Sequence, residues 1–528
     1  MAKSNAGRPN ILVVMSDQHN ARVSGPYGDS LVRTPNMDRL ANEGTVFERC
    51  YTPSPVCVPA RMSFVSGRRP SENGVTDNPD ILSSAILTWP ERLREYGYHT
   101  ALVGRMHFQG PDQWHGFETT FEELRHWRDG RPVRHQEVTE NVPNGGYWSP
   151  RSSIEELAGS GSTFVHYRDE VVCDRGLQFL REQAELQRGG GTAPTPAPAA
   201  SASPADRARG AARPFAAVIG FYNPHPPYIG KKEIFDYYYE KVEVPDDRLS
   251  SMPDYLADYY ATFRDWENPK PMASEAKRRA LAAYYANVEH ADTQLGRILE
   301  VLDQTGLAEN TLVIYTSDHG DFIGRRGAWS KMAMYDDTAR VPCIARLPGT
   351  IEAGRRSEHL LNLRDFGNTF CEIAGAPTPS GSDAPSRWGL FTGSGDPGPN
   401  ETESEIVQSP SPFGQKESSA LKMVIRWPWK LWCYQIGVER HFSLFHLEND
   451  PGETIDLSGR ADLDSLMSDL TNRLFEGWDP EFEIELAARR RADRAELEKV
   501  WMKDWLHAGH GFPEGYDAEV DSPHARGG

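Results

Sequence analysis

The chain has 528 residues, of which 57 are Lys or Arg and 76 are Asp or Glu, giving a formal net charge of −19 at pH 7. A chain this acidic is not expected to bind nucleic acid, and it has no apolar run long enough to span a membrane. Residues 1–9 lack the apolar stretch of a secretory leader, and the six scattered cysteines suit a reducing compartment. We therefore predict a cytoplasmic protein of enzyme size.

Strand-like and helix-like segments alternate between residues 10 and 316. Residues 10–15, 99–103, 215–221 and 311–316 are short, mostly apolar runs of the kind found in buried parallel strands. Helices are predicted over residues 35–43, 89–96 and 274–306, the last from apolar residues spaced by threes and fours. This alternation predicts an α/β fold in which a large, mostly parallel sheet is sandwiched by helices.

The composition changes at two places. Residues 188–213 are rich in Gly, Ala, Pro and Ser and predict a flexible surface insertion. Beyond a Gly/Pro cluster near residue 400, residues 421–434 and 441–446 resemble antiparallel strands and are followed by a charged helical tail. We predict a main domain over residues 1–400 and a smaller α+β subdomain over residues 401–528, built on a short antiparallel sheet.

Four of the predicted strands end in polar residues. Asp17, His107, His225 and Asp318 follow them, and in parallel sheets functional groups gather at this edge. A single Asp at such a place often only caps a turn. The pairs Asp17-Gln18 and Asp318-His319 together favour a divalent cation such as Ca²⁺, Mg²⁺ or Mn²⁺. The two histidines are candidates for general acid–base catalysis.

Cys57 stands four residues before Arg61 at the start of a short segment that predicts an amphipathic helical turn. This spacing fits a thiolate stabilised by a helix N-terminus and a cation, and equally a buried free cysteine beside a surface arginine. Lys331, taken alone, would be an ordinary surface lysine.

Several short motifs occur in a characteristic order. They are C-x-P-x-R (57–61), S-G-R (66–68), G-[KR]-x-H (104–107), H-P-P (225–227) and S-D-H-G-D (317–321), with Lys331 downstream. This composite resembles the signature of the formylglycine-dependent sulfatases, in the alkaline phosphatase superfamily. The resemblance runs from residue 9 to about residue 349 and returns over residues 445–457 (FHLENDPGETIDL).

The resemblance implies a role for each motif residue. It implies one divalent metal, Ca²⁺ first and Mn²⁺ or Mg²⁺ as alternatives, held by Asp17, Gln18, Asp318, His319 and residue 57. It also implies that a maturation enzyme oxidises Cys57 to formylglycine, whose hydrate is the nucleophile and is held by Arg61. It further implies that Arg105 and Lys331 bind the sulfate oxygens and that His107 and His225 transfer protons.

The sequence departs from the commonest family pattern at three positions. It has Arg105 where Lys is usual, Ala60 where Ser is common and Gln18 where many members have a second Asp. An arginine keeps the positive charge but differs in geometry from a lysine, which leaves the detailed role of Arg105 open.

The function that the resemblance implies is hydrolysis of a small anionic sulfate ester. A phosphonate monoester or phosphodiester hydrolase of the same superfamily is the alternative, and a non-catalytic metal- or anion-binding protein with an unconverted Cys57 is a remote one. Residues 106–118 and 329–342 look most like the choline sulfatase branch, although the sequence after residue 118 departs from it. The charged tail at 487–503 predicts a solvated helix, or a cover over a neighbouring subunit's pocket in a homo-oligomer.

Overall fold

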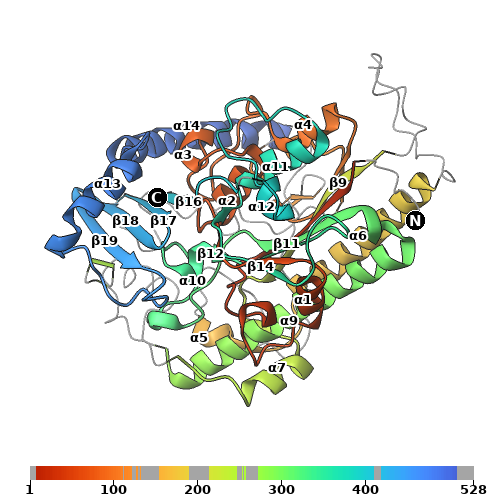
Figure 1. Cartoon of the computed structure of the whole chain (residues 1–528), viewed down its shortest axis with the longest axis horizontal. Coiled ribbons are helices and arrows are strands. Elements are labelled where there is room, and N and C mark those ends of the chain that lie inside the picture. Colours follow the sequence, from red (N-terminus) through yellow and green to blue (C-terminus); the bar gives the residue numbers. More distant parts are fainter. Residues whose placement is uncertain are drawn as a thin grey trace.

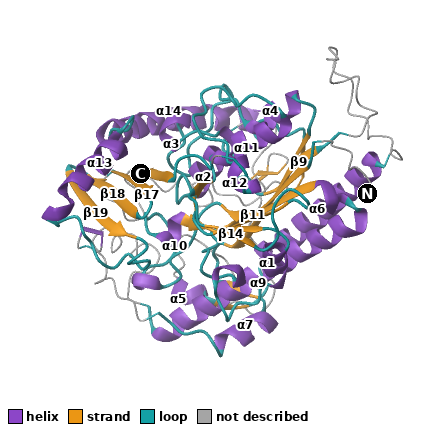
Figure 2. Cartoon of the chain, viewed as in Figure 1, coloured by secondary structure: helices purple, strands orange, loops and turns teal. Residues whose placement is uncertain are grey.

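The computed structural model describes residues 8–110, 112–121, 127–128, 131–132, 154–188, 213–245, 253, 255–256, 272–395, 397–408 and 418–507. Its centre is an eight-stranded sheet flanked by helices (Figures 1 and 2). In spatial order the strands are β14 (Arg355–Ser357), β2 (Thr45–Phe47), β13 (Cys343–Arg346), β11 (Thr311–Ser317), β1 (Asn10–Asp17), β9 (Phe215–Pro224), β4 (His99–Gly104) and β5 (Thr119–Phe121). From β11 to β5 all neighbours are parallel, whereas β13 is antiparallel to both β11 and β2. The predicted mostly parallel sheet is confirmed.

Both faces of the sheet are buried, as the apolar strand sequences predict. Ile11, Val13 and Met15 of β1 belong to one core cluster, and Leu12 and Val14 belong to the other. This separation follows from the two-residue period of a strand. The helices over the first face are α2 (Cys57–Ser66), α4 (Trp89–Glu95), α11 (Asp365–Ala374) and α12 (Trp388–Thr392). Those over the second are α1 (Pro35–Asn42), α6 (Phe164–Gln187) and α9 (Ser274–Thr305).

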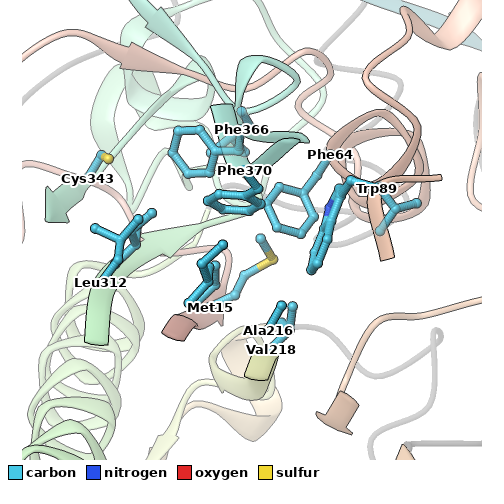
Figure 3. Close-up of a cluster of buried hydrophobic side chains, with 14 of the residues drawn as sticks. Met15, Phe64, Trp89, Ala216, Val218, Leu312, Cys343, Phe366 and Phe370 are labelled. Atoms are coloured by element: carbon cyan, nitrogen blue, oxygen red, sulfur yellow. The ribbon is translucent and has the colours of Figure 1, made fainter. Parts of the chain in front are cut away.

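Aromatic side chains fill the first face. Figure 3 shows Phe64, Trp89, Phe366 and Phe370 gathered over strand residues such as Met15. The Trp89 and Phe370 rings meet edge to face, with centroids 5.2 Å apart. Edge-to-face pairs add to the stability gained from burial alone. This packing fixes α2, the helix that begins with Cys57, against the sheet.

The predicted amphipathic character of the turn at Cys57 is wrong. All ten residues of α2 are buried, because the helix lies under α4 and α11 and has no face toward solvent. Cys57 is its first residue, and the preceding Val56 offers no side-chain cap. Asn78 replaces that cap: its Oδ1 accepts a hydrogen bond from Val58 N at 3.0 Å.

The C-terminal part forms the predicted antiparallel sheet. Its strands are β16 (Glu401–Gln408), β17 (Ser419–Arg426), β18 (Trp429–Ile436) and β19 (Glu439–His446). One face packs against α13 (Asp464–Phe475) and α14 (Pro480–His507), and the other packs around Tyr51 and Tyr335, which precede it in the chain (Figure 1). The charged tail is helical, and α14 also reaches the N-terminal part of the chain, where Arg491 Nη2 lies 3.5 Å from Asp77 Oδ2.

The remaining elements are short. They are β3 (Cys50–Tyr51), β6 (Trp127–Arg128), β7 (Arg131–Pro132), β8 (Gly159–Ser160), β10 (Ile229–Gly230), β12 (Arg340–Val341), β15 (Leu361–Asn362), α3 (Pro70–Asn73), α5 (Ile154–Leu157), α7 (Lys232–Tyr239) and α10 (Asp336–Ala339). The predicted insertion at 188–213 lies outside the described residues, apart from its two ends. No helix in the described part of the chain combines the length and apolar character needed to cross a bilayer.

Replacing Glu483 of α14 by Gln is expected to stabilise the fold by about 1–3 kcal/mol at pH 8. Burial and the neighbouring Glu405 raise the pKa of Glu483 to about 7. Because this folded-state pKa exceeds the unfolded one, ionisation reduces stability as pH rises through about 5 to 7. Urea unfolding of E483Q should therefore show a clear gain at pH 8 and a much smaller one at pH 5. Glu481→Gln, at an exposed position of the same helix, is the control, and equal gains at both pH values would contradict this assignment.

Candidate active site

The site begins where two central strands end. Asp17 is the last residue of β1, and Asp318 directly follows β11, its parallel neighbour. The two strands are in register through Ser16 and Ser317, so the two carboxylates reach the same edge of the sheet. Both are fully buried. Although burial opposes ionisation, Arg105 and other nearby cations hold the pKa of Asp17 well below its ordinary value.

Cys57 lies at the centre of this edge. Its Sγ is 2.9 Å from Lys331 Nζ, 3.2 Å from His319 Nε2 and 3.7 Å from Asp17 Oδ1. Burial and Asp17 disfavour the thiolate, but Lys331 and a hydrogen bond with His225 favour it, and the pKa of Cys57 lies below its ordinary value. Lys331 is buried against these groups and is not a surface lysine.

Arg61 joins the two aspartates. Its Nε lies 2.8 Å from Asp318 Oδ2, and its Nη2 lies 3.1 Å from Asp17 Oδ2. The third guanidinium direction is used as well, since Nη1 donates to the carbonyl oxygen of Arg105 at 2.7 Å. The Arg61 side chain is fully buried. The alternative interpretation of the Cys57–Arg61 spacing, a buried cysteine beside a surface arginine, is therefore wrong.

Asp17 Oδ1, Asp318 Oδ1 and His319 Nε2, none of which is bound by Arg61, are suited as ligands of a divalent cation. Arg61 binds the Oδ2 atom of each aspartate, and the Oδ1 atoms of Asp17 and Asp318 lie 3.9 and 3.7 Å from His319 Nε2. His319 Nδ1 donates to Gly320 O at 3.0 Å, which leaves the lone pair on Nε2, 3.2 Å from Lys331 Nζ and next to the two carboxylates. Burial lowers the pKa of His319 to about 4, so the ring is neutral, as a metal ligand must be. One donor atom each from Asp17, Cys57, Asp318 and His319 lies within 4.8 Å of the others.

Gln18 presents its amide oxygen to the same space. Its Oε1 accepts a hydrogen bond from Lys331 Nζ at 2.9 Å, and its Nε2 donates to Asp321 Oδ2 at 2.6 Å. Asp321 also accepts from Tyr228 OH at 2.6 Å. Because a carboxylate only accepts, Asp321 fixes the amide with its oxygen toward the site. Asp321 is the last residue of the S-D-H-G-D motif, but nothing in the sequence alone indicated that it orients Gln18.

The other predicted residues line the site beside Asp17. Arg105 Nε lies 2.5 Å from Asp17 Oδ2, and Arg105 Nη2 lies 2.9 Å from His107 Nδ1. The Arg105 guanidinium also stacks over the Tyr222 ring, 4.5 Å from its centroid. His225 lies beside the same ring and donates from Nδ1 to Pro226 O at 2.8 Å, which leaves Nε2 available for proton transfer. Tyr222 was missed because nothing in its sequence context distinguishes it from a core tyrosine.

Comparisons with known proteins identify the family and the fold of the chain. A phosphonate monoester hydrolase of Agrobacterium radiobacter superposes with a TM-score of 0.69 at 19% identity, covering 92% of this chain and 96% of that one. The Sulfatase family model matches residues 9–376, and a model described as N-sulphoglucosamine sulphohydrolase, C-terminal, matches residues 324–478. The chain belongs to the sulfatase family, as the motif composite predicted.

Two curated relatives show the range of the family around this chain. The choline-sulfatase of Rhizobium meliloti (strain 1021) is 32% identical over 378 residues, which cover 70% of this chain and 68% of the relative. The N-acetylglucosamine-6-O-sulfatase of Bacteroides thetaiotaomicron is 28% identical over 424 residues, which cover 72% and 70%. The names of these relatives differ in the alcohol that carries the sulfate.

Proposed function

We propose that the protein hydrolyses a sulfate monoester, with residue 57 as its nucleophile after oxidation of Cys57 to formylglycine by a maturation enzyme. The observation that carries the proposal is the position of Cys57 Sγ, in contact with Lys331 and His319 and beside Asp17. The six cysteines are all free, which supports expression in a reducing cytoplasm.

One divalent cation completes the proposed site. Asp17, Gln18, Asp318 and His319 would hold it together with residue 57; their carboxylate and amide oxygens suit Ca²⁺, Mn²⁺ or Mg²⁺, of which the family resemblance puts Ca²⁺ first. When bound, such an ion polarises a sulfuryl oxygen and lowers the pKa of a nearby hydroxyl. Arg61 contacts the Oδ2 atoms of both aspartates and so holds the two side chains in place around this space.

Arg105 and Lys331 bind the sulfate group, and Arg61 holds the hydrated formylglycine. Together with a bound divalent cation, Arg61, Arg105 and Lys331 outweigh the carboxylates of Asp17, Asp318 and Asp321, so the site would favour an anion. The acidic surface of the molecule does not oppose this, because charge is screened beyond about 8 Å at physiological salt. Fixed cations of this kind stabilise charge that develops on the transferring group.

The histidines carry the protons. Hydrated formylglycine supplies two hydroxyls on one carbon, of which one attacks sulfur and the other allows sulfate to leave. His225, through Nε2, or Lys331 protonates the departing alcohol. His107 then accepts the proton of the second hydroxyl, the role that the family resemblance implies for it. A serine or an unconverted cysteine at position 57 has no second hydroxyl to deprotonate.

Turnover of two matched substrates tests the proposal against its alternative. We expect kcat/KM for an aryl sulfate to exceed that for an aryl phosphonate monoester by at least about 10-fold, in protein shown to be converted at residue 57. The Arg105–His107 pair resembles the sulfatase pattern, whereas the fold is shared with phosphonate monoester hydrolases. The reverse preference would assign the alternative function. If protein that carries formylglycine at residue 57 and has been loaded with metal hydrolyses neither substrate, the result would support the remote alternative, a non-catalytic anion-binding protein.

A further inference from the structure

Lys331 lies in a strained stretch of backbone. Ser330 and Met332, on either side of it, have φ values of 66° and 76°, and Ile323 and Arg326 in the same segment also have positive φ. Residues other than glycine occupy this left-handed region only when surrounding contacts hold them there. The segment 323–336 therefore needs anchors, and the position of Lys331 depends on them.

The C-terminal sheet supplies several of these anchors. Tyr434 OH of β18 accepts a hydrogen bond from Met334 N at 3.1 Å. Gln408 Nε2 of β16 lies 2.7 Å from Met332 Sδ. These contacts bring one face of the C-terminal sheet against the residues that follow Lys331.

The strongest anchor joins the end of the segment to Glu453. Glu453 Oε2 accepts a hydrogen bond from Asp336 N at 2.7 Å. Between the two carboxylates lies the ammonium of Lys430, 2.9 Å from Asp336 Oδ1 and 2.6 Å from Glu453 Oε1. Lys430 is fully buried and Glu453 is 2% exposed, so water does not weaken these ion pairs.

The turn that carries Glu453 is itself fixed to the segment. Arg326 donates to the carbonyl oxygen of Gly452, and Arg22, from the loop after β1, donates to that of Pro451 at 2.9 Å. This turn belongs to the C-terminal stretch 445–457 that the family resemblance singles out, and the proposed chemistry gives it no role. Its contacts point to the Lys331 segment.

We propose that Glu453, acting with Lys430, is a positioning residue that holds Lys331 against Cys57 by fixing the Asp336 end of the strained segment. The inference rests on the proposed function, in which Lys331 binds the sulfate group. Glu453 itself contacts Asp336 and Lys430, and its effect on the reaction passes through Lys331 alone.

A double-mutant cycle between Glu453 and Lys331 tests this inference. Glu453→Ala is expected to lower kcat/KM on a nitrophenyl sulfate by about 10–100-fold, because a misplaced catalytic group costs about this much. In the Lys331→Ala background the same substitution should change kcat/KM by less than about 3-fold, since the group that it positions is already gone. Glu453→Gln restores an acceptor for Asp336 N and should recover part of the loss. All values refer to protein converted at residue 57.

Glu403→Ala is the matched control. Glu403 is also buried and is paired with a fully buried lysine of the same sheet, Lys422, at 3.1 Å, and with Arg364. Its loss should lower stability while leaving kcat/KM of the folded protein within about 2-fold. Equal effects of Glu453→Ala in both backgrounds would overturn the positioning role and leave the proposed function intact. Full activity of Lys331→Ala would instead overturn the role of Lys331 and, with it, this inference.

Discussion

Replacing Cys57 by alanine is expected to lower kcat/KM for an aryl sulfate by at least about 10⁴-fold while the protein stays folded. Residue 57 carries the attacking group in the proposed reaction, and none of the groups around its Sγ is a substitute nucleophile. Cys57→Ser should be similarly impaired, because a hydroxyl that attacked sulfur could not release sulfate afterwards. Initial rates and thermal unfolding, measured on the same samples, check both variants.

Cys173→Ala provides the comparison. Cys173 is also a fully buried cysteine, but it lies in α6, where its Sγ contacts Gln294 O. Its substitution should lower stability and keep the activity of the folded fraction within about 2-fold. Cys57→Ala is produced in the same host that converts Cys57 of the wild type to formylglycine. If this variant kept more than about 1% of the wild-type activity, residue 57 would not be the nucleophile.

Replacing Arg61 by leucine is expected to destabilise the protein by about 3–5 kcal/mol, the usual effect of removing one partner from a buried ion pair. The substitution leaves Asp318 Oδ2 without its cation, and Asp17 Oδ2 retains only Arg105. It also removes the hydrogen bond to the carbonyl oxygen of Arg105. Urea unfolding monitored by circular dichroism measures the change in the free energy of unfolding.

The control for this variant is a surface arginine. Arg489 pairs with Glu485 one helical turn away on α14, and both side chains are more than half exposed. Arg489→Leu should change the free energy of unfolding by no more than about 0.5 kcal/mol. A loss below about 1 kcal/mol for Arg61→Leu would show that the two aspartates do not depend on it, and the proposed electrostatic design of the site would be wrong.

Much of the fold could be predicted from local patterns. Four apolar runs gave the central strands to within a few residues, and the three- and four-residue spacing gave α9 almost to its ends. The antiparallel C-terminal sheet followed from a change in composition near residue 400. These features depend on neighbours in the sequence, which is why a single sequence suffices to find them.

The environment of Arg61 could not be predicted in this way. The spacing of Cys57 and Arg61 fits a surface arginine as well as a buried one, and the choice depends on Asp17 and Asp318, which come from two distant strands. Likewise, the burial of α2 on all sides depends on α4 and α11, which the sequence of α2 does not encode.

Two further contacts of the site could not be predicted either, because their partners are distant in the sequence. Asp321 orients Gln18 across about 300 residues of sequence, and Glu453 reaches Asp336 from the turn that follows β19. The motifs marked both regions as characteristic of a family, but only the fold shows which atoms they contact.

Mass spectrometry of residue 57 tests the central claim most directly. Protein from its native host is denatured, alkylated and digested with trypsin, which releases the peptide at residues 50–61 (CYTPSPVCVPAR) with Cys50 as an internal control. The account predicts one alkylated cysteine at position 50 and an aldehyde at position 57. Alkylation of both cysteines throughout the sample would contradict the formylglycine mechanism.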